Sequence, residues 1–98
     1  MKNIYIVHWA SASIDDDGNA QAYAGVHGVY SALEAAELGL MECKDVTYDE
    51  VVQNEEPEMI QYAIDNTRVY GSVKEGYFEI DYDFGAGPCE IYITITRQ

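Results

Sequence analysis

The chain has 98 residues, a length that accommodates a single domain, which we place at residues 1–98. Eighteen Asp and Glu residues against five Lys and Arg give a formal net charge of −13 at pH 7. Direct binding to a nucleic-acid backbone or an anionic membrane is not expected at this charge, because both require a cationic protein surface. Hydrophobic residues make up 48% of the chain, which is too apolar for a disordered protein.

The first third of the sequence predicts a β-hairpin. An apolar first strand covers residues 4–14, and residues 20–26 are predicted to return as the second strand. The acidic segment 15–19 between them is a turn, because Asp and Asn cap their own backbone and Gly18 accepts a positive φ. A calcium-loop interpretation of this turn fails, since the bidentate Glu of an EF-hand is missing.

A helix is predicted to follow the hairpin. Residues 31–34 have the Ser-x-x-Glu spacing of a capping box. Leu33, Ala36 and Leu40 then fall on one helical face. Gly39 is either the C-terminal stop of this helix or a weak point in a helix that continues.

Two further short helices are predicted in the middle of the chain. Residues 47–50 repeat the capping-box spacing and indicate a new helix start. Pro57 fits the first turn of another helix, which residues 66–67 end. The apolar face of that helix would consist of Met59, Ile60, Ala63 and Ile64.

The last third predicts three strands, at residues 69–74, 77–84 and 89–96, joined by a tight turn at 75–76 and a connection at 85–88. The resulting fold class is α+β. We expect about five strands in the order ββ-αα(α)-βββ, forming a mostly antiparallel sheet with two or three helices packed on one face.

The acidic residues are concentrated in the helical segment 34–65, which holds ten acids against one base, Lys44, and so has a local charge of −9. These acids are Glu34, Glu37, Glu42, Asp45, Asp49, Glu50, Glu55, Glu56, Glu58 and Asp65. A solvated helical face that keeps the protein soluble is the simplest interpretation. Solubility, however, needs a net charge of only about 2–8 in magnitude, and the excess costs stability through self-repulsion.

A second acidic feature lies in the strand at residues 77–84. Alternation places Glu79, Asp81 and Asp83 on one face, at intervals of about 6.6–6.8 Å. This row of carboxylates resembles a run of backbone phosphates, although an ordinary amphipathic strand with an acidic wet face would give the same pattern. Lys74 would relieve part of the repulsion if it paired across the hairpin.

The candidate partner-binding residues combine these two features. They are nine of the ten helical acids (all except Asp65), the strand row, and two tyrosines that lie near carboxylates, Tyr48 and Tyr82. Tyrosine adds a large, rigid contact area with a polar tip, which is typical of binding surfaces.

The sequence contains no recognisable enzyme motif. It lacks the G-x-S-x-G nucleophile elbow and the glycine-rich phosphate loops. His8 lies in an apolar strand and His27 in a flexible Gly-Val-His-Gly segment, without the spacing of metal ligands. We therefore expect no catalytic residue, no cofactor and no metal.

The two cysteines and the apolar runs bear on the compartment. Cys43 and Cys89 fit no C-x-x-C spacing. The apolar run at residues 4–7 is shorter than the ~7–15 residues of a signal peptide, and no run reaches the ~18 residues of a membrane span. We expect free thiols and a cytoplasmic location, in the host cell if the protein is phage-encoded.

Small size, the lack of catalytic motifs and concentrated acid resemble, in composition, the phage-encoded anti-CRISPR and anti-restriction DNA mimics. The resemblance implies an inhibitor that occupies a basic nucleic-acid-binding site of another protein, such as a nuclease or a CRISPR or restriction effector.

Two alternatives stay open. One is an immunity or antitoxin protein that neutralises a toxic nuclease. The other is a small structural or assembly module whose acid serves only solubility, with a homodimer through a free sheet edge at residues 89–98. The sequence also leaves open whether the helical and strand acids share one face of the molecule.

Overall fold

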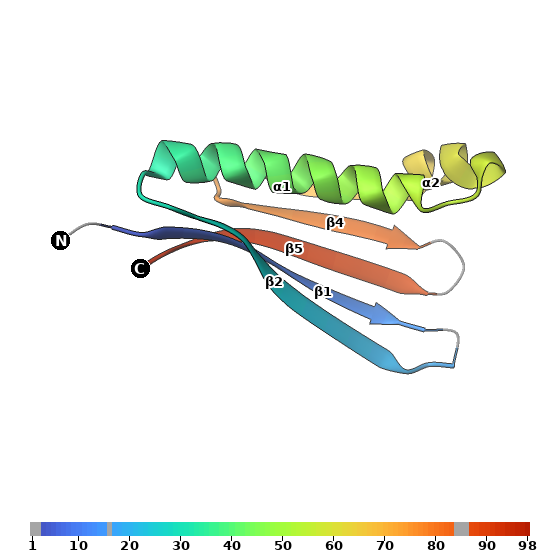
Figure 1. Cartoon of the computed structure of the whole chain (residues 1–98). Helices are drawn as coiled ribbons and strands as arrows, with labels where there is room; N and C mark the ends of the chain where they lie inside the picture. The colour runs from blue at the N-terminus through green and yellow to red at the C-terminus, as the bar shows by residue number, and fades with distance from the viewer. Residues whose placement is uncertain (1–2, 16, 84–86) are drawn as a thin grey trace.

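Five strands form one antiparallel sheet in the computed structural model, which describes residues 3–15, 17–83 and 87–98 (Figure 1). The strands are β1 (Tyr5–Ile14), β2 (Ala20–Tyr30), β3 (Arg68–Ser72), β4 (Tyr77–Asp83) and β5 (Pro88–Arg97). Two helices, α1 (Leu33–Gln53) and α2 (Ile60–Asn66), lie over one face of the sheet, and the 3₁₀ turn Pro57–Met59 precedes α2. The expected α+β class is confirmed, whereas Phe84 at the end of the predicted strand and residues 85–86 of the 85–88 connection lie outside the described residues.

The order of the strands is β2-β1-β5-β4-β3, and each neighbouring pair is antiparallel. β5 is therefore an inner strand, and the expectation of a free edge at residues 89–98 is wrong. β1 occupies that edge, from Tyr5 opposite Arg97 to Ser13 opposite Cys89. The hydrophobic pattern within a strand does not indicate its partner, so the pairing of β1 with β5, from opposite ends of the chain, could not be predicted from it. The free edges are β2 and β3.

Helix α1 is continuous, so the prediction of a separate helix starting at residues 47–50 is wrong. Neither capping box forms, because α1 begins after Ala32, which makes no side-chain capping bond, and runs on through the second motif. The buried positions Ala36, Leu40, Cys43 and Val51 share one face along its whole length. Packing of this stripe on the sheet stabilises the helix more than its caps do.

Gly39 is buried in the middle of α1 and does not end the helix. A Cβ atom at this position would overlap the ring of Tyr30 on β2. The glycine therefore lets the helix lie closely against the sheet, at a cost in helix propensity of about 1 kcal/mol relative to alanine.

The hydrophobic core lies between α1 and the sheet. Its largest completely buried side chains are Leu40, Ile80, Ile93 and Val7. Burying each of these contributes roughly 1.5–3 kcal/mol relative to leaving it exposed. Both helices pack on the same face of the sheet. In the described part of the chain no element covers the opposite face, which we call the open face.

Helix α2 is short, and only part of its predicted apolar face is buried. Ala63 is buried, but Met59 and Ile64 of the predicted apolar face are exposed. Thr67 ends the helix by donating its hydroxyl to the Ala63 carbonyl at 2.7 Å. In the described part of the chain, neither helix combines the length and apolar character that a membrane crossing needs.

The molecule is elongated, with extents of 49 × 27 × 18 Å and a radius of gyration of 14.7 Å. A compact chain of this length would have a radius near ~13 Å. Figure 1 shows the reason, because α1 and the long strands all run along one direction, and the tip of the β1–β2 hairpin diverges from α1.

Candidate functional site

The acidic strand predicted from the sequence is β4, and its alternation is as expected. Phe78 and Ile80 are buried in the core beneath the helices. Glu79 and Asp81 consequently point to the open face, and Asp83 continues the row at the end of the strand, where it is exposed.

A third strand residue, Glu90, joins this row from β5. It lies directly opposite Asp81 in the β4–β5 register. Oxygen atoms of Glu79, Asp81 and Glu90 all lie within 4.8 Å of one another. We call these three residues the carboxylate cluster. Sequence reasoning missed Glu90 because alternation within one strand does not tell which residue of the next strand lies beside it.

The electrostatics of the carboxylate cluster are unfavourable within the chain itself. Burial, together with the charges of Glu79 and Glu90, raises the pKa of Asp81. Its Oδ1 atom is buried and, in the part of the chain that the structure describes, has no hydrogen-bond partner. An unsatisfied buried oxygen of this kind costs free energy, so the cluster is a strained feature of the fold.

Tyr92 supports one side of the cluster. Its hydroxyl donates to the Glu90 carboxylate at 2.7 Å. The hydrogen bonds to Glu90 and Glu79 raise the pKa of Tyr92 well above its ordinary value, because the phenol must stay protonated to donate. Tyr92 is exposed, as are Tyr77 on the adjacent strand β4 and Tyr70 on the next strand, β3. The open face therefore combines carboxylates with tyrosine rings.

The cation nearest to the cluster by strand register is Arg68. It lies opposite Asp81 in the β3–β4 pair, and its guanidinium donates to the Asp65 carbonyl at 2.5 Å. Lys74, which the sequence suggested as a relieving charge, lies in the β3–β4 turn and lines a different hollow together with Arg97.

Three carboxylates at this spacing offer the oxygen donors that hard divalent cations take. Exposed acidic groups are common without an ion. We therefore describe the cluster as a charged surface and assign it no metal.

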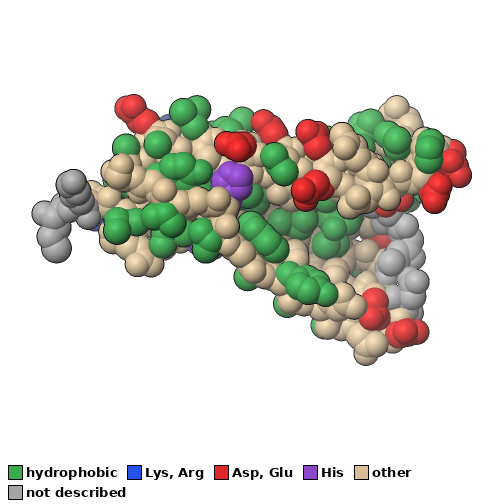
Figure 2. All heavy atoms as spheres, in the orientation of Figure 1, with side chains coloured by type: hydrophobic (Ala, Val, Ile, Leu, Met, Phe, Trp, Pro, Cys, Tyr) green, Lys and Arg blue, Asp and Glu red, His purple; other side chains and the backbone are tan. Residues whose placement is uncertain are grey.

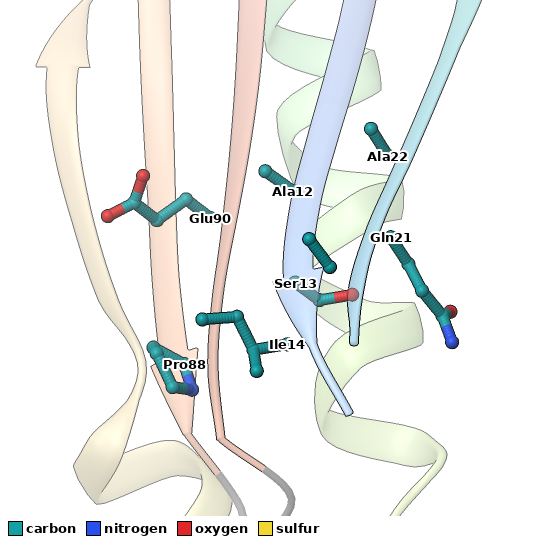
Figure 3. A pocket seen from close by; sticks show the side chains of 8 residues that line it. Ala12, Ser13, Ile14, Gln21, Ala22, Pro88 and Glu90 are labelled. Carbon is teal, nitrogen blue, oxygen red and sulfur yellow. The ribbon is translucent and has the colours of Figure 1, made fainter. Parts of the chain in front are cut away.

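An apolar groove of about 340 Å³ adjoins the cluster on the open face (Figure 3). Its lining residues come from the tip of the β1–β2 hairpin and from the start of β5. They include Ala12, Ile14, Ala20, Ala22, Pro88 and Glu90. Small alanine side chains leave the space, and Ile14 points toward Pro88 across it. Glu90 belongs both to the groove and to the carboxylate cluster.

The helical acids lie on the other side of the sheet. Figure 2 shows acidic side chains along α1 and at the α2 end of the helical layer. Most are exposed, whereas Glu37 and Glu55 are partly buried; the exposed members of the candidate set are Glu34, Glu42, Asp45, Asp49, Glu50, Glu56 and Glu58. Because the helices cover the face opposite the carboxylate cluster, the helical and strand acids form two separate surfaces.

The basic residue of the helical segment is already engaged. Lys44 pairs with Asp45 at 2.7 Å, and its Nζ atom lies 5.6 Å from the centre of the Phe78 ring. The helical surface thus has an internal counter-charge at this position.

The two tyrosines chosen from the sequence do not join the strand row. Tyr48 and Tyr82 are half-buried and pack against the core on the helical side. Burial and contact with Cys89 raise the pKa of Tyr82. The tyrosines of the open face are Tyr70, Tyr77 and Tyr92, which alternation on β3, β4 and β5 identifies once the buried face is known.

The remaining reactive groups lie apart from the cluster. The Nε2 atom of His8 is 2.6 Å from the Thr96 hydroxyl, and His27 lies at the irregularity in the β1–β2 pairing. Cys43 and Cys89 are free thiols, as expected from the sequence. Burial raises the pKa of the Cys43 thiol, which keeps it protonated and unreactive at neutral pH.

Comparison of the chain with protein-family models, with curated proteins and with solved structures finds no match. The open face itself is therefore the basis for assigning a function.

Proposed function

We propose that this protein is a non-catalytic inhibitor whose open face occupies a basic, nucleic-acid-binding site on another protein. The observation that supports this most directly is the carboxylate cluster, with three carboxylates within 4.8 Å and a buried Asp81 oxygen that lacks a partner among the described residues. Lysine or arginine of a basic partner would supply the missing positive charge and hydrogen bonds.

Solubility alone does not account for this arrangement. A carboxylate that only keeps a protein soluble works best where water surrounds it and other acids are distant. Asp81 is instead partly buried between two other carboxylates, which raises its pKa. Strained groups of this kind are typical of functional surfaces, because a ligand relieves the strain when it binds.

The neighbourhood of the cluster also favours the open face over the helical acids. The apolar groove beside Glu90 fits the aliphatic stem of a lysine or arginine whose charged head reaches the carboxylate cluster. The exposed ring of Tyr92 adds a surface on which a guanidinium can stack. Hollows also lie along α1, beside Glu34 and Glu37 and beside Glu50 and Glu55. Among the described residues, however, no three helical acids converge as the members of the carboxylate cluster do.

The class of partner follows from charge. Sites that bind nucleic acid are lined with lysine and arginine, and a protein of net charge −13 is steered toward them over long range. A CRISPR or restriction effector inhibited by a phage protein fits this description. A toxic nuclease neutralised by its immunity protein fits the same physics, and the choice of target in the test below separates the two.

The test is a DNA-cleavage assay with a panel of CRISPR effectors, restriction enzymes and toxin nucleases, each at increasing salt. Three proteins are compared: the unaltered chain, the cluster variant Glu79→Gln/Asp81→Asn/Glu90→Gln, and the control Glu34→Gln/Glu42→Gln/Asp49→Asn. The control removes the same number and type of charges from exposed positions of the helical surface.

We expect at least one target to be inhibited, with inhibition that weakens as salt rises and that DNA competes away. The cluster variant should lose most of this inhibition while the control keeps it. Equal loss in both variants would assign the effect to net charge, and loss only in the control would move the site to the helical acids. Inhibition of no target in the panel would contradict the proposal.

A further inference from the structure

We infer that two copies of this chain pair through their β2 edges and form one continuous antiparallel sheet. The inference concerns a surface other than the carboxylate cluster, and it does not depend on the proposed function. It rests on the difference between the two free edges of the sheet and on the distribution of charge.

The β3 edge carries the features that prevent edge pairing. It is five residues long, begins with Arg68, and contains Gly71 at a φ of +95°, which breaks the regular strand backbone. Short length, charge and backbone irregularity are the devices by which natural sheets protect an edge.

The β2 edge lacks these devices over most of its length. It is eleven residues long and contains no Asp, Glu, Lys, Arg or Pro. Its pairing with β1 is regular from Ala20 to Val26, and the one irregularity lies beyond Val26, at the end nearer α1. An unprotected strand of this length is a template for pairing with another strand.

The residues that present their peptide groups at this edge can be assigned. At the hairpin turn the Asp15 amide donates to the Asn19 carbonyl at 3.0 Å. Hydrogen-bonded positions alternate along an antiparallel pair, so the odd-numbered residues of the regular part of β2 bond to β1. Ala20, Ala22 and Ala24 therefore direct their N–H and C=O groups outward, and all three are exposed.

Charge makes a second copy the occupant that fits this edge. Each copy carries −13, so two copies can approach only where local charge is absent. Neither β1 nor β2 contains Asp, Glu, Lys or Arg, and the basic side chains of this hairpin are the histidines His8 and His27. Figure 2 shows apolar side chains along this hairpin, with acidic ones only near its tip. A basic partner would find no charge here to attract it.

Self-pairing of the segment from Ala20 to Val26 is symmetric about Tyr23. An antiparallel two-fold pair centred there places Ala22 opposite the second copy's Ala24 and sets the two Tyr23 side chains beside each other. Tyr23 is 62% exposed in the single chain, so it has surface to bury in this contact. Aromatic cross-strand pairs of this kind stabilise sheets.

The expected pair is weak. Stable complexes usually bury about 800 Å² on each partner, and a pairing of seven-residue segments buries less than that. Association should therefore depend on concentration. It should also strengthen as salt rises, because salt screens the repulsion between two acidic copies, whereas binding to a basic partner weakens.

The test is analytical ultracentrifugation of the full chain over a range of protein and salt concentrations. Two edge variants are compared, Ala24→Lys, which adds an edge lysine, and Ala22→Pro, which removes an outward N–H group. The matched control is Ala10→Lys, because Ala10 lies opposite Ala24 on the inner strand β1 and is also exposed. Circular dichroism establishes that each variant is folded.

We expect the unaltered chain and Ala10→Lys to reach twice the monomer mass of 11.0 kDa at high concentration and high salt. The folded edge variants should remain at the monomer mass. A monomer under all conditions would overturn the inference, as would pairing of the edge variants equal to that of the control. The cluster variant described above should still pair, so failure here and failure of the proposed function are distinguishable.

Discussion

Asp81 on β4 lies directly opposite Glu90 on β5, and both carboxylates point to the same face of the sheet. Like charges at directly opposed positions of an antiparallel pair are destabilising. The fold nevertheless holds them there, with Glu79 beside them and the Tyr92 hydroxyl bonded to Glu90. This relationship makes the cost of the acidic face measurable in the isolated protein.

Asp81→Asn is expected to stabilise the fold. The change removes one of the three charges from the carboxylate cluster, and the relief should be about 0.2–1 kcal/mol in the free energy of unfolding. Urea denaturation measures it. Asp49→Asn, the same change at an exposed position of α1, serves as the control and should alter stability by less. A loss of stability in Asp81→Asn would mean that the carboxylate makes a favourable internal contact.

The stabilisation by Asp81→Asn should depend on pH. The pKa of Asp81 is raised above its ordinary value of 3.8, so the folded state binds this proton more tightly than the unfolded state does. Protonation of Asp81 therefore adds to the free energy of unfolding. This contribution is complete below pH 3.8 and is lost as the pH rises through the raised folded-state pKa.

The difference in unfolding free energy between Asp81→Asn and the unaltered chain should therefore grow from acidic to neutral pH. The turn carboxylate Asp15 is a useful contrast, because backbone hydrogen bonds lower its pKa. Its contribution is present above pH 3.8 and is lost as the pH falls through its lowered folded-state pKa. If the difference in unfolding free energy for Asp81→Asn stays constant with pH, the pKa of Asp81 is not raised in the folded state.

Gly39→Ala should destabilise the protein although alanine is the better helix former by about 1 kcal/mol. The new Cβ atom would overlap the Tyr30 ring, and overpacking of this kind costs about 1–3 kcal/mol. Thermal and urea unfolding measure the change. Adding Tyr30→Phe should restore part of the loss, because the hydroxyl is the nearest atom. Leu38→Ala, at a position 74% exposed, should change little.

The two thiols should react at different rates with a maleimide reagent. Cys89 is partly exposed, whereas Cys43 is buried and its pKa is raised, so little thiolate is present at neutral pH. Mass spectrometry of the native protein should show one label first, at Cys89. Cys43 should react at the rate of global unfolding, and the Cys89→Ser variant isolates that rate. Equal rates at both positions would contradict the burial of Cys43.

Much of the sheet was predictable because strand alternation is a local property. The buried Phe78 and Ile80 and the outward Glu79 and Asp81 follow from a period of two along β4. The place of β5 between β1 and β4 was not predictable in this way. That order depends on contacts between distant segments, and so does the position of Glu90 beside Asp81.

The helical region shows the opposite limit, in which local signals were present and were overridden. Residues 47–50 have a capping-box pattern, yet they lie within α1 because Cys43 and Val51 on either side continue the buried stripe. The sequence also left open whether Gly39 ends the helix or lies within it, and the contact with Tyr30 explains why a glycine lies within it. Tertiary packing, which a single sequence does not display, determined both outcomes.

The unequal edges of the sheet have a consequence for the size of the assembly. Pairing through β2 is isologous, so each copy uses its one unprotected edge and the outer ends of the pair are the short β3 strands. Association of this kind would close at two copies and would not propagate into a filament. The two carboxylate clusters would then lie on a common face of the joined sheet. Counted from the middle of one β4–β5 pair to the middle of the other, they would be six strand spacings apart, roughly 29 Å at about 4.8 Å each. A two-fold symmetric basic partner would engage both clusters at once and gain avidity from the second contact.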